Sequence, residues 1–121
     1  IDIEKKQRPY HRRIDYWLGS STEINLKNIP LDAKVMVILD SDHSKSHVLK
    51  ELQIYSKLVT EGQYLIVEDT NINGHPALPE FGAGPMEAVE EFIKTSDFRG
   101  DKSREKFLLT FNPKGYLIKS E

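Results

Sequence analysis

AKVMVILDSDHSK, residues 33–45, begins as a nearly continuous apolar run and ends in two aspartates, a histidine and a lysine. An apolar run such as 33–40 is typical of a strand that is buried on both faces in a parallel sheet. YLIVED, residues 64–69, has the same design, with a short apolar run that ends in two acidic residues. The two segments therefore predict two buried, parallel strands.

The residues between these strands have the pattern of an amphipathic helix. Apolar residues recur with helical spacing from Val48 to Val59. Ser44 or Ser46 is placed to cap the helix, and Gly62 is placed to end it. Strand, helix and strand then form a βαβ unit with a right-handed crossover, which predicts an α/β fold.

Three segments complete the expected fold. Residues 71–85, NINGHPALPEFGAGP, hold three prolines and three glycines, which indicates an irregular loop whose length suggests a function. PMEAVEEFIKTS, residues 85–96, starts with proline at a first helical turn and predicts a second helix. Residues 106–120, KFLLTFNPKGYLIKS, predict two antiparallel strands around the turn at 112–115. We expect a mostly parallel sheet with a C-terminal antiparallel hairpin.

Composition narrows the class of protein. The chain has 121 residues and no cysteine, which indicates one domain and excludes disulfides and thiolate metal sites. Its 17 basic and 19 acidic residues leave a net charge of −2, so we expect no nucleic-acid partner. No apolar run approaches the roughly 20 residues that cross a bilayer. We predict a soluble, cytoplasmic protein.

Acidic residues follow both predicted strands. Asp40 and Asp42 come after the first strand, and Glu68 and Asp69 end the second. Ligands bind beyond the carboxyl ends of strands in open parallel sheets, so these carboxylates are expected to converge there. A hard cation such as Mg²⁺ would relieve their mutual repulsion. Acidic residues at such positions also serve as helix caps or loop acceptors, and the pattern alone leaves both interpretations open.

Four segments resemble the cephalosporin hydroxylase family, whose members have a Rossmann-like class I S-adenosylmethionine-dependent methyltransferase fold. They are LDSDHSKSHVLKEL, YLIVEDTNINGHP, GPMEAVEEF and DKSREKFLLTFNPKGYL, and they occur in the family's order. The resemblance implies a Mg²⁺-dependent O-methyltransferase that uses S-adenosylmethionine and acts on a hydroxyl of a small molecule or sugar. It implies Asp42, Glu68 and Asp69 as metal ligands, with Asp40 as the alternative to Asp42.

The resemblance also implies catalytic residues. In catechol O-methyltransferase and its relatives, a metal aspartate precedes a catalytic lysine by three positions, and the segment from Asp42 to Lys45 repeats this spacing. Lys45 is therefore a candidate general base, and the neighbouring His43 is a second candidate catalytic residue. A lysine at a helix start is also often only a solvated side chain.

The cofactor site implied by the family draws on the N-terminal part of the chain. IDIE, residues 1–4, resembles the end of the family's second strand, in which an acidic residue binds the ribose hydroxyls. The segment GSS resembles a family segment near the adenine. The cofactor-binding candidates are Asp2, Glu4, Gly19, Ser20, Ser21 and Asp40. The family's first strand and glycine-rich loop have no counterpart in the chain, so residues 1–121 are expected to form a single partial domain, truncated at the N-terminus, whose own activity is in doubt.

Two other functions fit parts of the sequence. His43 and His47, with a carboxylate, have the residue types of the facial triad of a non-haem iron hydroxylase. The basic segment 8–13 would suit a non-catalytic module that binds an anionic partner, although such a charge run is more often a solvated face. An unpaired sheet edge in a truncated domain would favour homo-oligomers.

Overall fold

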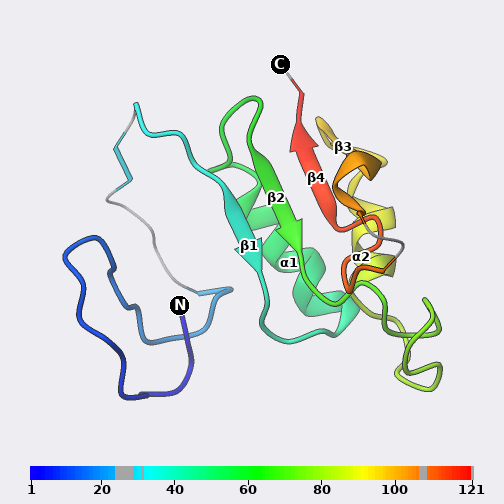
Figure 1. Ribbon diagram of the computed structural model, residues 1–121, viewed down its shortest axis with the longest axis horizontal. Helices are drawn as coiled ribbons and strands as arrows, with labels where there is room; N and C mark the ends of the chain where they lie inside the picture. The colour runs from blue at the N-terminus through cyan, green and yellow to red at the C-terminus, as the bar shows by residue number, and fades with distance from the viewer. Residues whose placement is uncertain (24–28, 31, 107–108, 121) are drawn as a thin grey trace.

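The computed structural model describes residues 1–23, 29–30, 32–106 and 109–120 and has a mixed α/β fold. Four strands form one sheet in the order β1-β2-β4-β3 (Figure 1). The elements are β1 (Val37–Leu39), α1 (Lys45–Tyr55), β2 (Tyr64–Val67), α2 (Pro85–Phe92), β3 (Phe98–Gly100), a short 3-10 helix (Lys102–Arg104) and β4 (Tyr116–Lys119).

The predicted βαβ unit is confirmed. β1 and β2 pair in parallel, with Val37 opposite Leu65 and Leu39 opposite Val67, and α1 connects them. Leu39, Leu65 and Val67 are buried, whereas Ile38, which directly precedes Leu39 in β1, is 54% exposed. The strands are therefore covered on one face rather than on both.

The first helix is shorter than the sequence pattern indicates. It ends at Tyr55, and a hydrogen bond from the Leu58 amide to the Tyr55 carbonyl then turns the chain. Val59 keeps its place in the core from this turn, and Gly62 lies in the later turn before β2 with a φ of 70°. At the other end Ser44 is the N-cap residue, but its side chain makes no capping hydrogen bond.

The prediction of a C-terminal hairpin is wrong about which strands pair with the last strand. β4 lies between β2 and β3 and is antiparallel to both. Of the expected first hairpin strand, residues 107–108 lie outside the described residues, and Leu109 and Phe111 have exposed side chains. The turn itself is confirmed, because the Gly115 amide donates to the Asn112 carbonyl at 2.9 Å. The sheet is therefore mixed, with one parallel pair and two antiparallel pairs, and not mostly parallel.

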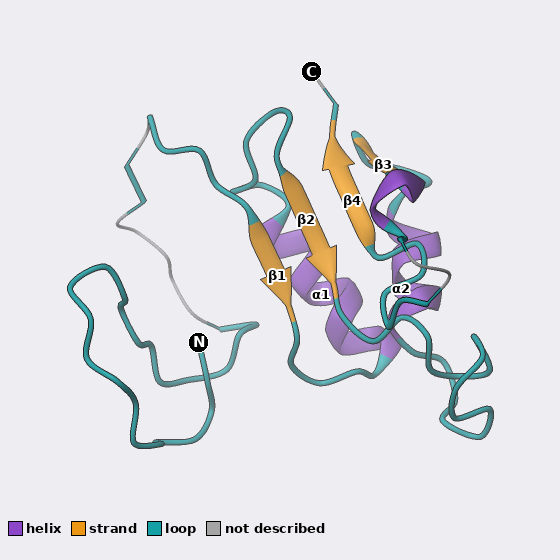
Figure 2. Cartoon of the chain, in the orientation of Figure 1, coloured by secondary structure: helices purple, strands orange, loops and turns teal. Residues whose placement is uncertain are grey.

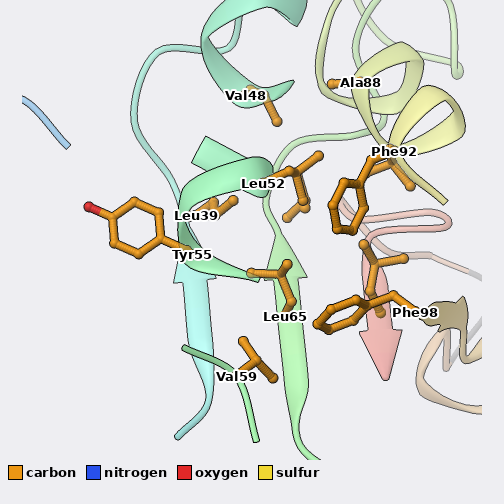
Figure 3. Close-up of a cluster of buried hydrophobic side chains, with 12 residues drawn as sticks. Leu39, Val48, Leu52, Tyr55, Val59, Leu65, Ala88, Phe92 and Phe98 are labelled. Carbon is orange, nitrogen blue, oxygen red and sulfur yellow. The ribbon is translucent and has the colours of Figure 1, made fainter. Parts of the chain in front are cut away.

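Both helices lie on the same side of the sheet (Figure 2). Side chains from the helices and from that face of the strands form one core (Figure 3). Leu52, Leu65 and Leu117 are fully buried in this core. The Phe92 and Phe98 rings meet at a centroid distance of 5.7 Å and link α2 to β3. This core holds the ends of β1 and β2 at fixed positions.

The N-terminal segment does not join the sheet. Residues 1–23 form an irregular loop on the β1 side of the molecule (Figure 1). Asp2 makes an isolated parallel bridge with Leu18, so the expected strand at residues 1–4 is reduced to one bridge. Within the part of the chain that the structure describes, β1 pairs only with β2 and leaves its other edge open. Neither α1 nor α2 has the length and apolar character required to cross a membrane.

Candidate functional site

Three side chains meet at the carboxyl ends of β1 and β2. Asp40 directly follows β1, His43 precedes α1, and Asp69 lies two residues beyond β2. The His43 Nε2 atom is 3.5 Å from Asp40 Oδ1 and 3.5 Å from Asp69 Oδ2. Ligand atoms of all three residues lie within 4.8 Å of one another, and they form the one such group among the described residues. His43 Nε2 is buried and has no hydrogen-bond partner there.

The backbone at Asp69 is in a conformation that few non-glycine residues adopt. Its φ is 53°, in the left-handed region, where a side chain is strained. The preceding Glu68 amide still donates to the Leu39 carbonyl at 3.0 Å, as in the parallel ladder. The chain therefore leaves the strand abruptly at Asp69, whose carboxylate then faces His43.

Asp42 is not a member of this group. Its exposed carboxylate accepts a hydrogen bond of 2.8 Å from the Ser44 amide at the start of α1. Hydrogen bonding to Ser44, through its side chain and its backbone amide, holds the pKa of Asp42 below its ordinary value. The structure thus gives Asp42 the role of a loop hydrogen-bond acceptor, which the sequence left open, and its role as a metal ligand stays a prediction. Asp40, the sequence alternative, occupies the place beside His43.

Glu68 and Asp69, the other two predicted metal ligands, do not lie in the same group. Asp69 belongs to the group with His43, whereas Glu68 does not. Glu68 instead accepts a hydrogen bond of 2.7 Å from the side-chain amide of Asn112. The carboxylates of the two neighbouring acids therefore have different neighbours, His43 for Asp69 and Asn112 for Glu68.

Lys45 lies in the first turn of α1 and faces α2. Its Nζ is 2.7 Å from the Glu91 carboxylate, and both side chains are partly exposed. The Lys45 amide donates to the Ala83 carbonyl, which joins the start of α1 to the end of the 71–84 loop. The candidate base is thus held in an ion pair, and its catalytic role stays a prediction.

All six predicted cofactor residues line one cleft. The cleft has a volume of about 510 Å³ and lies between the N-terminal segment and the end of β1. Its walls include Asp2, Glu4, Gly19, Ser20, Ser21 and Asp40, together with Asp42 and His47. The structure thus brings together residues that are up to 38 positions apart, although their cofactor role remains a prediction.

Asp2 is already engaged at the rim of this cleft. Its carboxylate accepts from the Glu4 amide at 2.9 Å and pairs with Arg8 at 2.7 Å. The Glu4 hydrogen bond, together with the charges of Lys6 and Arg8, holds the pKa of Asp2 below its ordinary value. The carboxylate is therefore ionised at neutral pH and able to accept hydrogen bonds from ribose hydroxyls.

His43 and His47 do not converge as an iron triad requires. His47 Nε2 lies 3.2 Å from Ser21 Oγ and 3.5 Å from Glu51 Oε1, on the cleft side of α1. Glu51 is only 2% exposed, and one of its carboxylate oxygens has no hydrogen-bond partner among the described residues. The two histidines thus contact different side chains and do not face a common point. This arrangement removes the geometric basis of the facial-triad interpretation.

The 71–84 loop is fastened to α2 by one carboxylate. Glu87 accepts hydrogen bonds from Asn73 at 3.1 Å, from His75 at 2.8 Å and from the Gly84 amide at 2.7 Å. Burial raises the pKa of Glu87, but these hydrogen bonds outweigh it and lower the pKa to about 2. Asn73 and His75 therefore anchor the loop to α2.

Sequence reasoning missed four polar residues around the site. Glu87 had a detectable pattern, because a glutamate at the third helical position is typical of a capping box. Glu51 stood out as an acidic residue on the apolar face of α1. Asn112 and Glu91 gave no such indication, because their partners are distant in the sequence.

Comparisons with known proteins place the chain in a family. The chain matches the Rhamnosyl O-methyltransferase/CmcI family over residues 1–120. It is 51% identical over 89 residues to a rhamnosyl O-methyltransferase of Mycobacterium leprae, which covers 71% of this chain and 39% of the relative. It is 50% identical over 90 residues to proteins of the same name from Mycobacterium bovis and Mycobacterium tuberculosis, with 72% and 37% covered.

These relatives are much longer than the chain, which spans less than two fifths of their length. No solved structure matches the chain. The cephalosporin hydroxylase family that its motifs resemble is related to the matched family but not identical to it. From the match over almost its full length, the chain belongs to the Rhamnosyl O-methyltransferase/CmcI family.

Proposed function

We propose that the chain is the part of an S-adenosylmethionine- and metal-dependent O-methyltransferase that carries the acidic metal site. The acceptor of this enzyme is a sugar hydroxyl. The observation that carries this proposal is the position of the Asp40–His43–Asp69 group beside the cleft that gathers the six cofactor candidates. Family membership supports methyl transfer, and the names of the relatives support a sugar acceptor.

The donor set suits a divalent cation. The carboxylates of Asp40 and Asp69 face the buried Nε2 atom of His43, which lacks a hydrogen-bond partner among the described residues. Two negative charges and an unpartnered imidazole nitrogen therefore lie close together. Carboxylate oxygens favour Mg²⁺ or Mn²⁺, and an imidazole ligand shifts the preference towards Mn²⁺. Asp69 is common to this group and to the set implied by the family, so we propose Asp69 as a ligand in either case. When bound, the cation would lower the pKa of the acceptor hydroxyl and orient its oxygen.

The residues of the chain have separate roles in this proposal. Asp2 binds the ribose hydroxyls, and the Gly19–Ser21 segment faces the adenine. Lys45 takes the proton from the acceptor hydroxyl as its oxygen attacks the methyl group, while the bond from methyl carbon to sulfonium sulfur breaks. His43 is the alternative base only if the cation is held by Asp42, Glu68 and Asp69, because a metal-bound imidazole nitrogen cannot take a proton. Positioning of the two substrates supplies most of the rate enhancement.

The chain covers less than two fifths of the length of its relatives. We propose that the family's first strand and glycine-rich loop complete the cofactor site in the full-length protein. The open edge of β1 supports this view, because it borders a second hollow of about 470 Å³, with Ile1 also in its lining.

Metal binding tests the proposal on the chain itself. Titration with Mn²⁺, followed by electron paramagnetic resonance, is expected to show one site that Asp69→Asn abolishes. Asp40→Asn and Asp42→Asn separate the two ligand sets, because the variant that loses a true ligand binds Mn²⁺ more weakly. Asp97→Asn, which changes an exposed acid directly before β3 that pairs with Lys119, is the control.

The full-length protein tests the reaction. It is expected to transfer the methyl group of S-adenosylmethionine to a rhamnose hydroxyl only when the divalent cation is present. Equal activity in the presence of a chelator, or in Asp69→Asn, would refute the metal-dependent mechanism.

A further inference from the structure

The turn at residues 111–115 is docked on the end of β2. Glu68 and Asp69, the acidic pair, directly follow β2, and three hydrogen bonds that do not involve them fix the turn there. The Val67 amide donates to the Gly115 carbonyl at 2.9 Å, Thr70 Oγ1 donates to the Pro113 carbonyl at 2.6 Å, and the Asn71 amide donates to the Phe111 carbonyl at 3.0 Å. The turn therefore runs alongside residues 67–71, which include the acidic pair.

Asn112 is the residue of this turn that touches the acidic pair. Its side chain is buried, with 6% of the residue exposed. Oδ1 accepts from the Asp69 amide at 2.8 Å, and Nδ2 donates to Glu68 Oε2 at 2.7 Å. Only this orientation of the amide satisfies both partners, because the reverse would set Nδ2 against a donor and Oδ1 against a carboxylate.

Each contact has a distinct effect on the acidic pair. The bond to the Asp69 amide supports the left-handed backbone that aims the Asp69 carboxylate at His43. The bond to Glu68 occupies one carboxylate oxygen and leaves the other without a hydrogen bond among the described residues. An amide is also neutral, so it orients two acids without cancelling the charge that attracts a cation.

We propose that Asn112 is a positioning residue that fixes both Glu68 and Asp69 for cation binding. This inference rests on the proposed metal-dependent function. A purely structural role is the competing explanation, because loss of a buried hydrogen-bonding side chain also destabilises the fold.

Thr70 provides the matched control. It is fully buried and bonds the same turn through Pro113, but its side chain makes no hydrogen bond to Glu68 or Asp69. Thr70→Val removes that hydrogen bond with little change in shape. Asn112→Ala and Thr70→Val should therefore loosen the same turn, while only the former releases the acidic pair.

Mn²⁺ titration of the 121-residue chain tests the proposal, with urea unfolding of each variant alongside. We expect Asn112→Ala to weaken Mn²⁺ binding about ten- to a hundredfold, as other residues that orient metal ligands do. Thr70→Val is expected to bind Mn²⁺ as tightly as the unsubstituted chain. Binding retained in Asn112→Ala, or weakened equally in both variants, would overturn the positioning role alone. No Mn²⁺ binding by the unsubstituted chain would overturn the proposed metal function as well.

A measurement on the unsubstituted chain keeps the test decisive if Asn112→Ala does not fold. Nuclear magnetic resonance with diamagnetic Mg²⁺ reports on the side-chain amide of Asn112 directly. We expect its signals to shift on Mg²⁺ addition while those of Gln53, on the exposed side of α1, stay in place. Unchanged Asn112 signals with saturated Mg²⁺ binding would contradict the proposal.

Discussion

Gly115 shows how close the last turn lies to β2. A Cβ at this position would clash with the Val67 carbonyl oxygen and lie 3.2 Å from the Cβ and carbonyl oxygen of Asn112. All of these neighbours except the Asn112 Cβ belong to the backbone, so they yield only if the turn moves away from the strand. Absence of a side chain at Gly115 is therefore a condition for the acidic pair to be held.

Gly115→Ala is predicted to lower the free energy of unfolding by about 1–3 kcal/mol, the usual cost of overpacking. Urea unfolding followed by circular dichroism measures this change. Gly100→Ala is the control, because nothing lies within 4 Å of a Cβ at Gly100 and the residue is exposed. Equal stability of the two variants would mean that the turn is not packed on β2.

Residues near the strands were predictable, and residues that arrive from far along the chain were not. The acidic ends of the two buried segments followed from hydrophobic pattern, and the structure places Asp40 and Asp69 together there. The strained backbone of Asp69 and the reach of Asn112 across 43 residues depend on tertiary contacts. A local pattern carries no information about such contacts.

The α2 helix controls the long loop through Glu87. This carboxylate bonds both ends of the segment from Asn73 to Gly84, so its ionised form fastens the loop to the start of α2. Its pKa of about 2, against an ordinary value of 4.5, means that the folded state favours the ionised form. The stabilisation is therefore complete above pH 4.5 and is lost as the pH falls towards 2.

Glu87→Gln is predicted to be less stable than the unsubstituted chain at neutral pH, and the difference should shrink as the pH falls from about 4.5 towards 2. Urea unfolding at a series of pH values measures it. Glu80→Gln, at an exposed position of the same loop, should show a small difference at every pH. A constant difference for Glu87→Gln would contradict the assigned role of its charge.

At the level of elements, long patterns predicted well and short ones did not. The runs at 33–40 and 64–69 were long enough to identify β1 and β2. β3 has three residues, of which only Phe98 is buried, so it has no periodic pattern. From the sequence alone, the segment just before β4 was the only recognisable partner for it. The position of β4 between β2 and β3 was therefore missed.

The whole molecule presents an open edge at β1. Met36 is 52% exposed and Ile38 54% exposed beside this edge. Unpaired backbone groups next to apolar side chains favour pairing with another strand, from the rest of the protein or from a second copy. The 121-residue chain alone has only the second option.

The isolated chain is predicted to self-associate as its concentration rises, and Ile38→Lys should weaken the association, because a charged side chain disfavours strand pairing. Sedimentation velocity measures the distribution of species. Leu78→Lys alters a similarly exposed apolar residue in the long loop and should leave the association unchanged. A monomer at every concentration would show that the open edge of β1 does not mediate self-association.

The hydrogen bond from Asn112 to Glu68 spans 44 residues, which has a consequence for the order of synthesis. Proteins are made from the N-terminus, so both acids leave the ribosome long before the residue that orients them. A chain interrupted between α2 and β4 would hold every acidic ligand and still lack their arrangement. Cation binding would then report that the last strand has been made and has taken its place.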